Sequence, residues 1–114
     1  MQLKKLHAAF FRTAIGREPV REWLRSLNRE ERRKIGQDIA TAECGWPVGM
    51  PVCRPLGDGL FEIRSELGGG RIARVIFCIA DGHIVLLHGF VKKTQRTPRG
   101  DLLLASKRRK DLIP

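Results

Sequence analysis

The spacing of hydrophobic residues changes along the chain, from a helical period in the first half to a strand-like pattern in the second. Residues 19–27 predict a helix, because one of its faces gathers four apolar side chains: Val20, Trp23, Leu24 and Leu27. Residues 29–43 predict a second helix, whose apolar stripe consists of Ile35, Ile39 and Ala42. An apolar run at residues 6–12 predicts a strand before both helices. We expect Trp23 in the core, with stacking on a nucleic-acid base as the alternative.

Local signals mark where the two helices begin and end. Pro19 suits the first turn of a helix, because an N–H at that position would have no intrahelical partner. Asn28, followed three residues later by Glu31, resembles a capping arrangement at the start of the second helix. Residues 44–47 end that helix, and the Pro- and Gly-rich residues 45–59 predict an irregular connector.

The second half of the chain predicts three strands. Residues 60–65 alternate between apolar and polar side chains, which is typical of a half-buried strand. Residues 71–80 and 83–91 are apolar on both faces, so we expect them in the centre of the sheet. Asp81-Gly82 between these two runs is a strong signal for a tight hairpin turn.

A last helix is predicted at residues 97–112. Thr97 is the expected N-cap, and Pro98 would occupy the first helical position. The predicted order is therefore β-α-α-β-β-β-α. We expect a small α+β protein with a mostly antiparallel sheet, in which residues 1–114 form a single domain.

The two-residue turn also predicts how the last two strands pair. If pairing is regular, Arg74 lies opposite Gly89 and Val75 lies opposite His88. Because side chains alternate between the two faces of a strand, His88 and Lys92 would then share one face of the sheet. Arg74 would lie on the other face.

Composition favours a globular protein with a polyanionic partner. The chain has 114 residues, 42% of them hydrophobic, which suits one domain with a modest core. Its formal net charge is +10. So much positive charge on a small domain favours RNA, DNA or an anionic surface as the partner. Solubility alone and an acidic protein partner are the alternatives.

Other features bear on localisation and on cysteine chemistry. No apolar run approaches the roughly 18 residues of a membrane span, and no small-residue cleavage pattern follows the N-terminal segment, so we expect a cytoplasmic protein. The three cysteines, Cys44, Cys53 and Cys78, lack CxxC spacing and indicate neither a disulfide framework nor a zinc site. Cys78 is expected to be a buried apolar residue. A catalytic Cys–His pair is the alternative.

Chain connectivity gathers basic side chains at the end of the sheet away from the Asp-Gly turn: Arg64, Arg71, Arg74, His88, Lys92 and Lys93. Like charges in contact repel by about 1 kcal/mol per pair even in water. A cluster that costs stability in this way favours an anion-binding site. The alternatives are a structural ion pair of Arg64 or Arg74 with Glu62 or Asp101, and a half-buried core position for His88. For the two lysines, the alternative is protection of a strand edge.

Several motifs in residues 59–98 resemble those of one known family. They are Gly59-Leu60-Phe61-Glu62-Ile63-Arg64, Arg71-Ile72-x-Arg74-Val75, Leu86-Leu87-His88-Gly89-Phe90 and Lys92-Lys93-Thr94-Gln95-x-Thr97-Pro98. Together they resemble the phage-derived branch of the RelE/HigB toxin superfamily. A weaker likeness extends upstream through residues 17–27 to near the N-terminus, so the resemblance covers most of the chain. The resemblance implies a small RelE-like α+β domain and the toxin of a type II toxin–antitoxin pair.

The resemblance also implies an activity and partners. Such toxins are mRNA interferases, endoribonucleases that often cut mRNA in the ribosomal A site, and we expect neither a metal nor another cofactor. They are neutralised by a cognate antitoxin, often a helix-turn-helix protein, so DNA would be contacted only through the toxin–antitoxin complex. The alternative is a non-catalytic RNA- or ribosome-binding module, or an inactive homologue whose main partner is the antitoxin.

Residue roles follow from the resemblance together with the charge pattern. Arg64 and Arg74 are expected to hold the scissile phosphate, because a guanidinium fork matches phosphate oxygens. Lys92 or Lys93 is expected to assist as phosphate clamp or proton carrier, and His88 is the candidate general acid or base. Further RNA contacts are expected from Arg71, Thr94, Arg96 and Arg99. The chain contains no Tyr, so only Phe or Trp could stack on a base.

Overall fold

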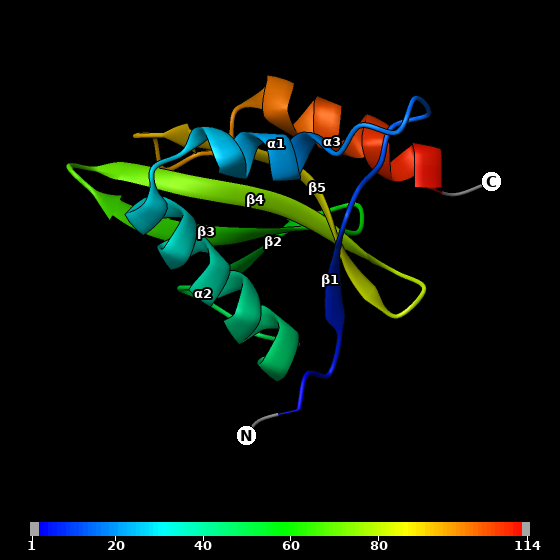
Figure 1. Cartoon of the computed structure of the whole chain (residues 1–114), viewed down its shortest axis with the longest axis horizontal. Coiled ribbons are helices and arrows are strands. Elements are labelled where there is room, and N and C mark those ends of the chain that lie inside the picture. The colour runs from blue at the N-terminus through cyan, green and yellow to red at the C-terminus, as the bar shows by residue number, and fades with distance from the viewer. Residues whose placement is uncertain (1–2, 113–114) are drawn as a thin grey trace.

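Within residues 3–112, which the computed structural model describes, the protein forms a five-stranded sheet with helices on both faces (Figure 1). The elements are β1 (His7–Phe10), α1 (Pro19–Ser26), α2 (Arg29–Gly45), β2 (Cys53–Gly57), β3 (Leu60–Gly68), β4 (Arg71–Ala80), β5 (His83–Lys92) and α3 (Arg99–Leu112). The strand order is β1-β5-β4-β3-β2, so β4 is central. β1 runs parallel to β5, and the other neighbouring strands are antiparallel. No helix in this part of the chain is long and apolar enough to cross a membrane.

The predicted α+β fold with a mostly antiparallel sheet is confirmed, but one strand was missed. β2 lies inside the segment predicted as an irregular connector and pairs with β3. Pro55 and Gly57 conceal it in the sequence, because both residue types are depleted in strands. Pro55 is tolerated because β2 is an edge strand, where one side of the backbone needs no partner in the sheet.

Three of the five predicted helix-boundary signals are confirmed, among them the end of α2, which falls at Gly45. Pro19 is the first residue of α1, and the Asn28 side chain accepts a hydrogen bond from the Glu31 N–H at 2.9 Å at the start of α2. The N-cap predicted at Thr97 and the first helical position predicted for Pro98 are both wrong, because α3 begins only at Arg99. The Thr97 hydroxyl instead donates a hydrogen bond to Glu62.

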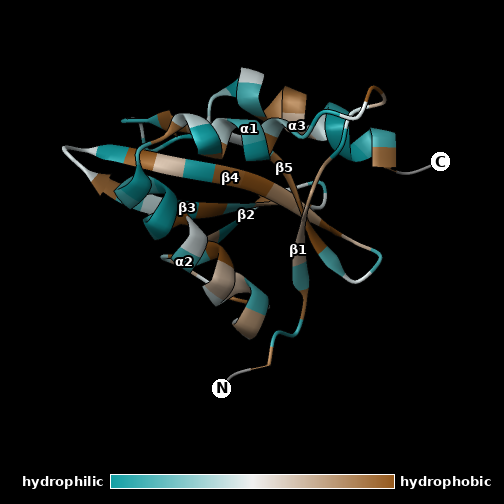
Figure 2. Cartoon of the chain, viewed as in Figure 1, coloured by the Kyte–Doolittle hydropathy of each residue, from teal (hydrophilic) through white to brown (hydrophobic). Residues whose placement is uncertain are grey.

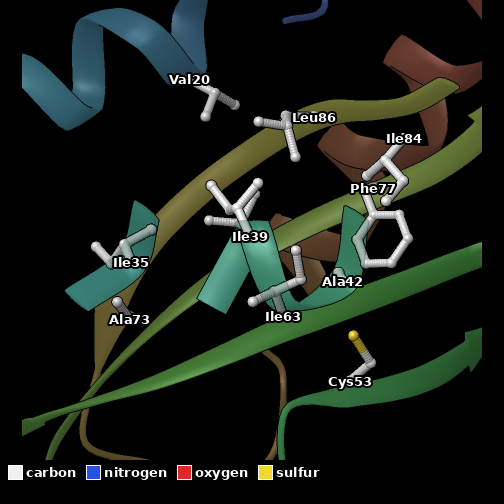
Figure 3. Packing of buried hydrophobic residues seen from close by; sticks show 11 residues of the cluster. Val20, Ile35, Ile39, Ala42, Cys53, Ile63, Ala73, Phe77, Ile84 and Leu86 are labelled. Carbon is white, nitrogen blue, oxygen red and sulfur yellow. The ribbon is translucent and has the colours of Figure 1, made fainter. Parts of the chain in front are cut away.

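The larger hydrophobic cluster lies between the sheet and the helices α1 and α2 (Figure 3). Val20 of α1 and Ile35 of α2 pack there with strand residues such as Phe77 and Leu86, all of them buried. Trp23 packs against the same cluster, so its predicted core position is confirmed. This burial of apolar area is the main force that fixes α1 and α2 on one face.

A second cluster covers the opposite face of the sheet beneath α3. Ala105 of α3 packs there with Ile76, Cys78, Leu87 and Phe90. The buried position predicted for Cys78 is thus confirmed. Hydropathy colouring shows apolar residues along much of β4 (Figure 2), as expected for a strand whose two faces are both covered.

The pairing of β4 with β5 departs from the predicted register. Pairing is regular near the Asp-Gly turn and shifts by one residue between Ile76 and Phe77. As a result, Arg74 lies opposite Phe90, and His88 lies opposite Ile76. The predicted placement of Arg74 opposite Gly89, with His88 on the other face, is therefore wrong.

An extra residue in β5 causes this shift. Leu86 pairs with Phe77 and His88 pairs with Ile76, so Leu87 between them is a β-bulge. Leu86 belongs to the cluster beneath α1 and α2, and Leu87 to the cluster beneath α3. After the bulge, His88 points to the same face as Arg74.

Gly89 generates a stability prediction. A Cβ at this position would overlap the indole ring of Trp23, which α1 places against β5. We expect Gly89→Ala to lower the free energy of unfolding by about 1–3 kcal/mol, because a rigid ring in a packed core has little room to move. Urea denaturation measures this change.

Gly36→Ala is the matched control, because Gly36 is exposed within α2 and a Cβ there meets no atom within 4 Å. This variant should be stabilised, by up to about 1 kcal/mol, since Ala favours helix over Gly. Equal stability of the two variants would contradict the Trp23 packing.

Candidate functional site

The loop between β5 and α3, residues 93–98, is fastened to the end of the sheet by polar side chains from β2, β3 and β4. Arg74 donates hydrogen bonds to the backbone carbonyls of Thr94 and Arg96, the latter at 3.0 Å. The Thr97 hydroxyl donates to Glu62 at 2.6 Å. The loop therefore lies over the face of the sheet that α3 also covers.

Arg74 is a charged residue in the central strand, and its side chain is completely buried, at 0% exposure. Burial lowers the pKa of its guanidinium, while the nearby Glu62 carboxylate acts in the opposite direction. Glu62 is also 0% exposed. The geometry therefore engages Arg74 with the protein's own carbonyl groups and not with solvent.

The polar network around Arg74 is only partly satisfied. Within the described residues, Glu62 Oε1 and Arg74 Nε are buried and have no hydrogen-bond partner. The nearest ionic neighbour of Glu62 Oε1 is Arg64 Nε, at 3.9 Å. Removing either charge would leave the other one buried with less compensation, which is costly in a protein interior.

Arg64 lies directly opposite Arg74 in the β3–β4 pairing, so the two side chains share one face. Its Nη2 donates to the Gln95 side-chain oxygen at 3.0 Å, and its side chain is 12% exposed. Arg64 also lines a hollow of about 530 Å³ together with Glu66, Gln95 and neighbouring residues. Of the two arginines predicted to hold a phosphate, Arg64 is the one that reaches a cavity.

Exposed cations follow the end of β5. Lys92, Lys93, Arg96 and Arg99 are all exposed, and none of them forms an ion pair within residues 3–112. Thr94 is exposed as well.

A groove of about 610 Å³ lies between β2, this loop and the start of α3. Arg54, Arg96 and Arg99 line it together with apolar residues that include Leu56 and Leu102. A cationic rim beside apolar walls suits a ligand that combines negative charge with flat apolar surface.

His88 has a carboxylate partner that the sequence did not reveal. Its Nε2 lies 2.6 Å from Asp101 Oδ1, and its ring stacks on Phe90 with centroids 5.4 Å apart. Asp101 lies in the first turn of α3. Docking of α3 on the sheet brings together these two residues, which are 13 positions apart in the chain.

Arg71 is at the same end of the sheet but is separated from the other cations. Its Nη1 lies 2.6 Å from Glu31 Oε2 on α2, which packs on the opposite face. The Arg71 guanidinium lowers the pKa of the Glu31 carboxyl group. The structure thus brings Arg64, Arg74 and His88 to one face and places Arg71 in an ion pair elsewhere.

Sequence reasoning did not assign Arg54 or Gln95 to the site, and it considered Glu62 only as an ion-pair partner of Arg64 or Arg74. Arg54 lies in the strand that was taken for a connector, opposite Glu62 of β3. Glu62 had two signals, its polar position in a strand with apolar neighbours and its place in the motif of residues 59–64. Within residues 3–112, no group of three or more His, Cys, Asp or Glu side chains is arranged to hold a metal ion.

The cysteines lie outside this network, and their environment generates a prediction. Burial raises the pKa of the Cys53 thiol to about 11 and also raises that of Cys78, so both are protonated at neutral pH. Cys44 is partly exposed. With a thiol reagent at pH 7.5, we expect only Cys44 to react rapidly in the folded protein, and all three cysteines to react in urea.

The Cys44→Ser variant should lose the rapid reaction entirely. Rapid modification of Cys53 or Cys78 in the folded state would show that reagent and solvent reach these two thiols despite their burial.

Fold and site together define a small α+β domain that carries a cationic loop and groove over one face of its sheet. The chain belongs to the family described as Phage derived protein Gp49-like (DUF891), whose family model matches residues 22–110. This is a RelE/toxin-like family, and the fold is consistent with a RelE-like one. A comparison with curated protein sequences finds no match.

Proposed function

We propose that the protein is the toxin of a type II toxin–antitoxin pair and that it cleaves mRNA at the ribosome, in the cytoplasm. The observation that carries the proposal is the set of exposed cations in residues 92–99, which form no ion pair within residues 3–112 and of which Arg96 and Arg99 line a groove. Family membership supports it, because the family is toxin-like. A polyanion is the ligand that best compensates charges held together in this way.

Cleavage through the RNA 2′-hydroxyl needs three contributions. A base removes the hydroxyl proton, cations stabilise the doubly charged phosphorane, and an acid protonates the leaving 5′-oxygen. Arg64, Lys92 and Lys93 would supply the cationic stabilisation, and electrostatic stabilisation of this kind usually contributes most to lowering the barrier. None of these steps requires a metal ion or another cofactor.

His88 is the proposed proton carrier, and Asp101 holds its ring. When the Asp101 carboxylate accepts a hydrogen bond from Nε2, the proton of the neutral ring sits on Nε2 and leaves Nδ1 as an acceptor. The stacked Phe90 ring fixes the plane of the imidazole. With its ring held in this way, a histidine can accept and return a proton at Nδ1 without rotation of the ring.

Arg96, Arg99 and Thr94 are the proposed contacts to flanking nucleotides, because they are exposed around the groove. Arg71 also belongs to the proposed RNA-binding set but lies apart from its other members, because its guanidinium forms an ion pair with Glu31 in the free protein. A cognate antitoxin, often a helix-turn-helix protein in such pairs, is the proposed inhibitor. Its contact with DNA would recruit the toxin to DNA only indirectly.

A second candidate function is binding to RNA or to the ribosome without cleavage. It is favoured by the position of the aromatic side chains, which are not placed to stack on a base. Phe77 and Phe90 are buried, and Trp23 and Trp46 pack against the core. The chain has no Tyr. Without an exposed aromatic ring, a nucleotide base would have to be positioned by apolar groove residues such as Leu56.

Paired lysine variants test the proposed activity. We expect Lys92→Gln combined with Lys93→Gln to slow mRNA cleavage in a reconstituted translation reaction at least tenfold, about 1.4 kcal/mol in activation free energy. Lys107→Gln combined with Lys110→Gln removes the same charge from exposed positions farther along α3, and should change the rate less than threefold. Mapping mRNA 5′ ends over time gives both rates.

Equal losses in the two double variants would mean that net charge, and not the position of the lysines, matters. Ribosome binding that weakens steeply with salt but leaves mRNA uncut would favour the second candidate function.

A further inference from the structure

We propose that Arg74 and Glu62 form a buried latch that holds residues 94–97 in one conformation, so that both act as positioning residues and neither contacts RNA. This inference rests on the proposed function only for its effect on cleavage. The latch itself is a property of the folded chain and can be tested without any RNA.

The latch is built from backbone groups of the loop. The Arg74 guanidinium reaches the carbonyls of Thr94 and Arg96, two residues apart, with its two terminal nitrogens. The Thr94 hydroxyl donates to that same Arg96 carbonyl at 3.1 Å. A rigid fork with several donors is suited to bridging two carbonyl groups, whereas the single ammonium of a lysine is not.

Glu62 makes the second attachment, one residue farther along the loop. The Thr97 hydroxyl donates to Glu62 Oε2 at 2.6 Å, and both residues are buried. The loop is therefore fastened at Thr94, Arg96 and Thr97 to two neighbouring strands. Attachment on both sides of Arg96 fixes where its side chain leaves the backbone.

Burial argues against a direct phosphate contact by Arg74. Its side chain is 0% exposed, so a phosphate could reach it only by displacing the carbonyls of the loop. Those carbonyls face inward, and the side chains of Lys93, Thr94 and Arg96 are left exposed. The latch thus turns the backbone toward the protein and the cations toward solvent.

Electrostatics explains why such a loop needs a latch. Residues 92–99 carry four cations and no acidic residue, and like charges at close range push a flexible segment apart. A loop held only by its ends would also lose more conformational entropy on binding RNA. Because the latch binds two backbone carbonyls and the buried Thr97 hydroxyl, the side chains of the four cations stay free to contact a substrate.

Trypsin tests the latch with sites that the loop already contains, since it cleaves after Lys92, Lys93, Arg96 and Arg99. We expect Thr97→Val, which removes one hydroxyl without changing charge, to speed cleavage within residues 92–99 at least fivefold. Arg74→Lys, which keeps the charge but loses the fork, should do the same. Thr97→Ser retains the hydroxyl and should remain close to the wild-type rate.

The control is Arg108→Lys, because Arg108 is a partly buried arginine that likewise donates to a backbone carbonyl, that of Leu87 at 2.8 Å. It should leave trypsin cleavage of the loop unchanged. Urea denaturation of each variant separates loosening of the loop from general unfolding. Wild-type protection of the loop in both Thr97→Val and Arg74→Lys would overturn the proposal.

Cleavage kinetics then distinguish positioning from contact. If the latch positions the loop, Thr97→Val should raise KM for mRNA at least threefold, in parallel with the faster proteolysis. A large loss of kcat in Arg74→Lys with a fully protected loop would overturn the proposal in favour of direct phosphate contact. If the wild-type protein cuts no mRNA, the proteolysis result alone decides whether the latch exists.

Discussion

The burial of Arg74 in the central strand is the constraint on which the rest of the site depends. A guanidinium group removed from water is tolerated only where acceptors and a counter-charge surround it. The loop after β5 brings two carbonyl groups, and Glu62 of β3 brings the carboxylate. The chain must therefore turn back over the sheet before α3 can begin. That turn places the first helical residues of α3 over β5, where Asp101 meets His88.

The periodicity of the sequence predicts most of the fold because each element has to bury one or both faces. Val20, Ile35 and Ile63 illustrate this, since all three are fully buried where their spacing places them. Periodicity cannot reveal the bulge in β5, because Leu86 and Leu87 are both apolar and suit either face of the sheet. A prediction without the bulge therefore assigns every residue of β5 after Leu87 to the wrong face of the sheet.

Less of the site could be predicted than of the fold. Chain connectivity is enough to bring Arg64 and Lys92 to one end of the sheet, because hairpins return the chain to where it started. It does not reveal the face on which a side chain lies, and Arg71 packs against α2 as a result. The partners of Glu62 and His88 depend on how a loop and a helix dock, which no local pattern encodes.

The acidic residues offset the net charge of +10 unevenly over the molecule. Most ion pairs involve α1, α2 or the residues next to them: Lys4–Glu43, Arg12–Glu18, Arg17–Glu22, Arg21–Glu18, Lys34–Asp38 and Arg71–Glu31. Every acid in these pairs lies between residues 18 and 43.

On the other face of the sheet the acids are engaged differently. Glu62 is buried beside Arg64 and Arg74, and Asp101 binds His88. Neither carboxylate forms an ion pair with the cations of residues 92–99, which therefore contribute positive potential over the loop and the groove. A polyanion approaching this face meets exposed cations that form no ion pair within residues 3–112. Repulsion among the same cations makes the loop costly to keep ordered in the free protein. The loop is anchored by the buried side chains of Arg74 and Glu62. Exposed ion pairs would be weaker anchors, because a polyanion would compete for their cations.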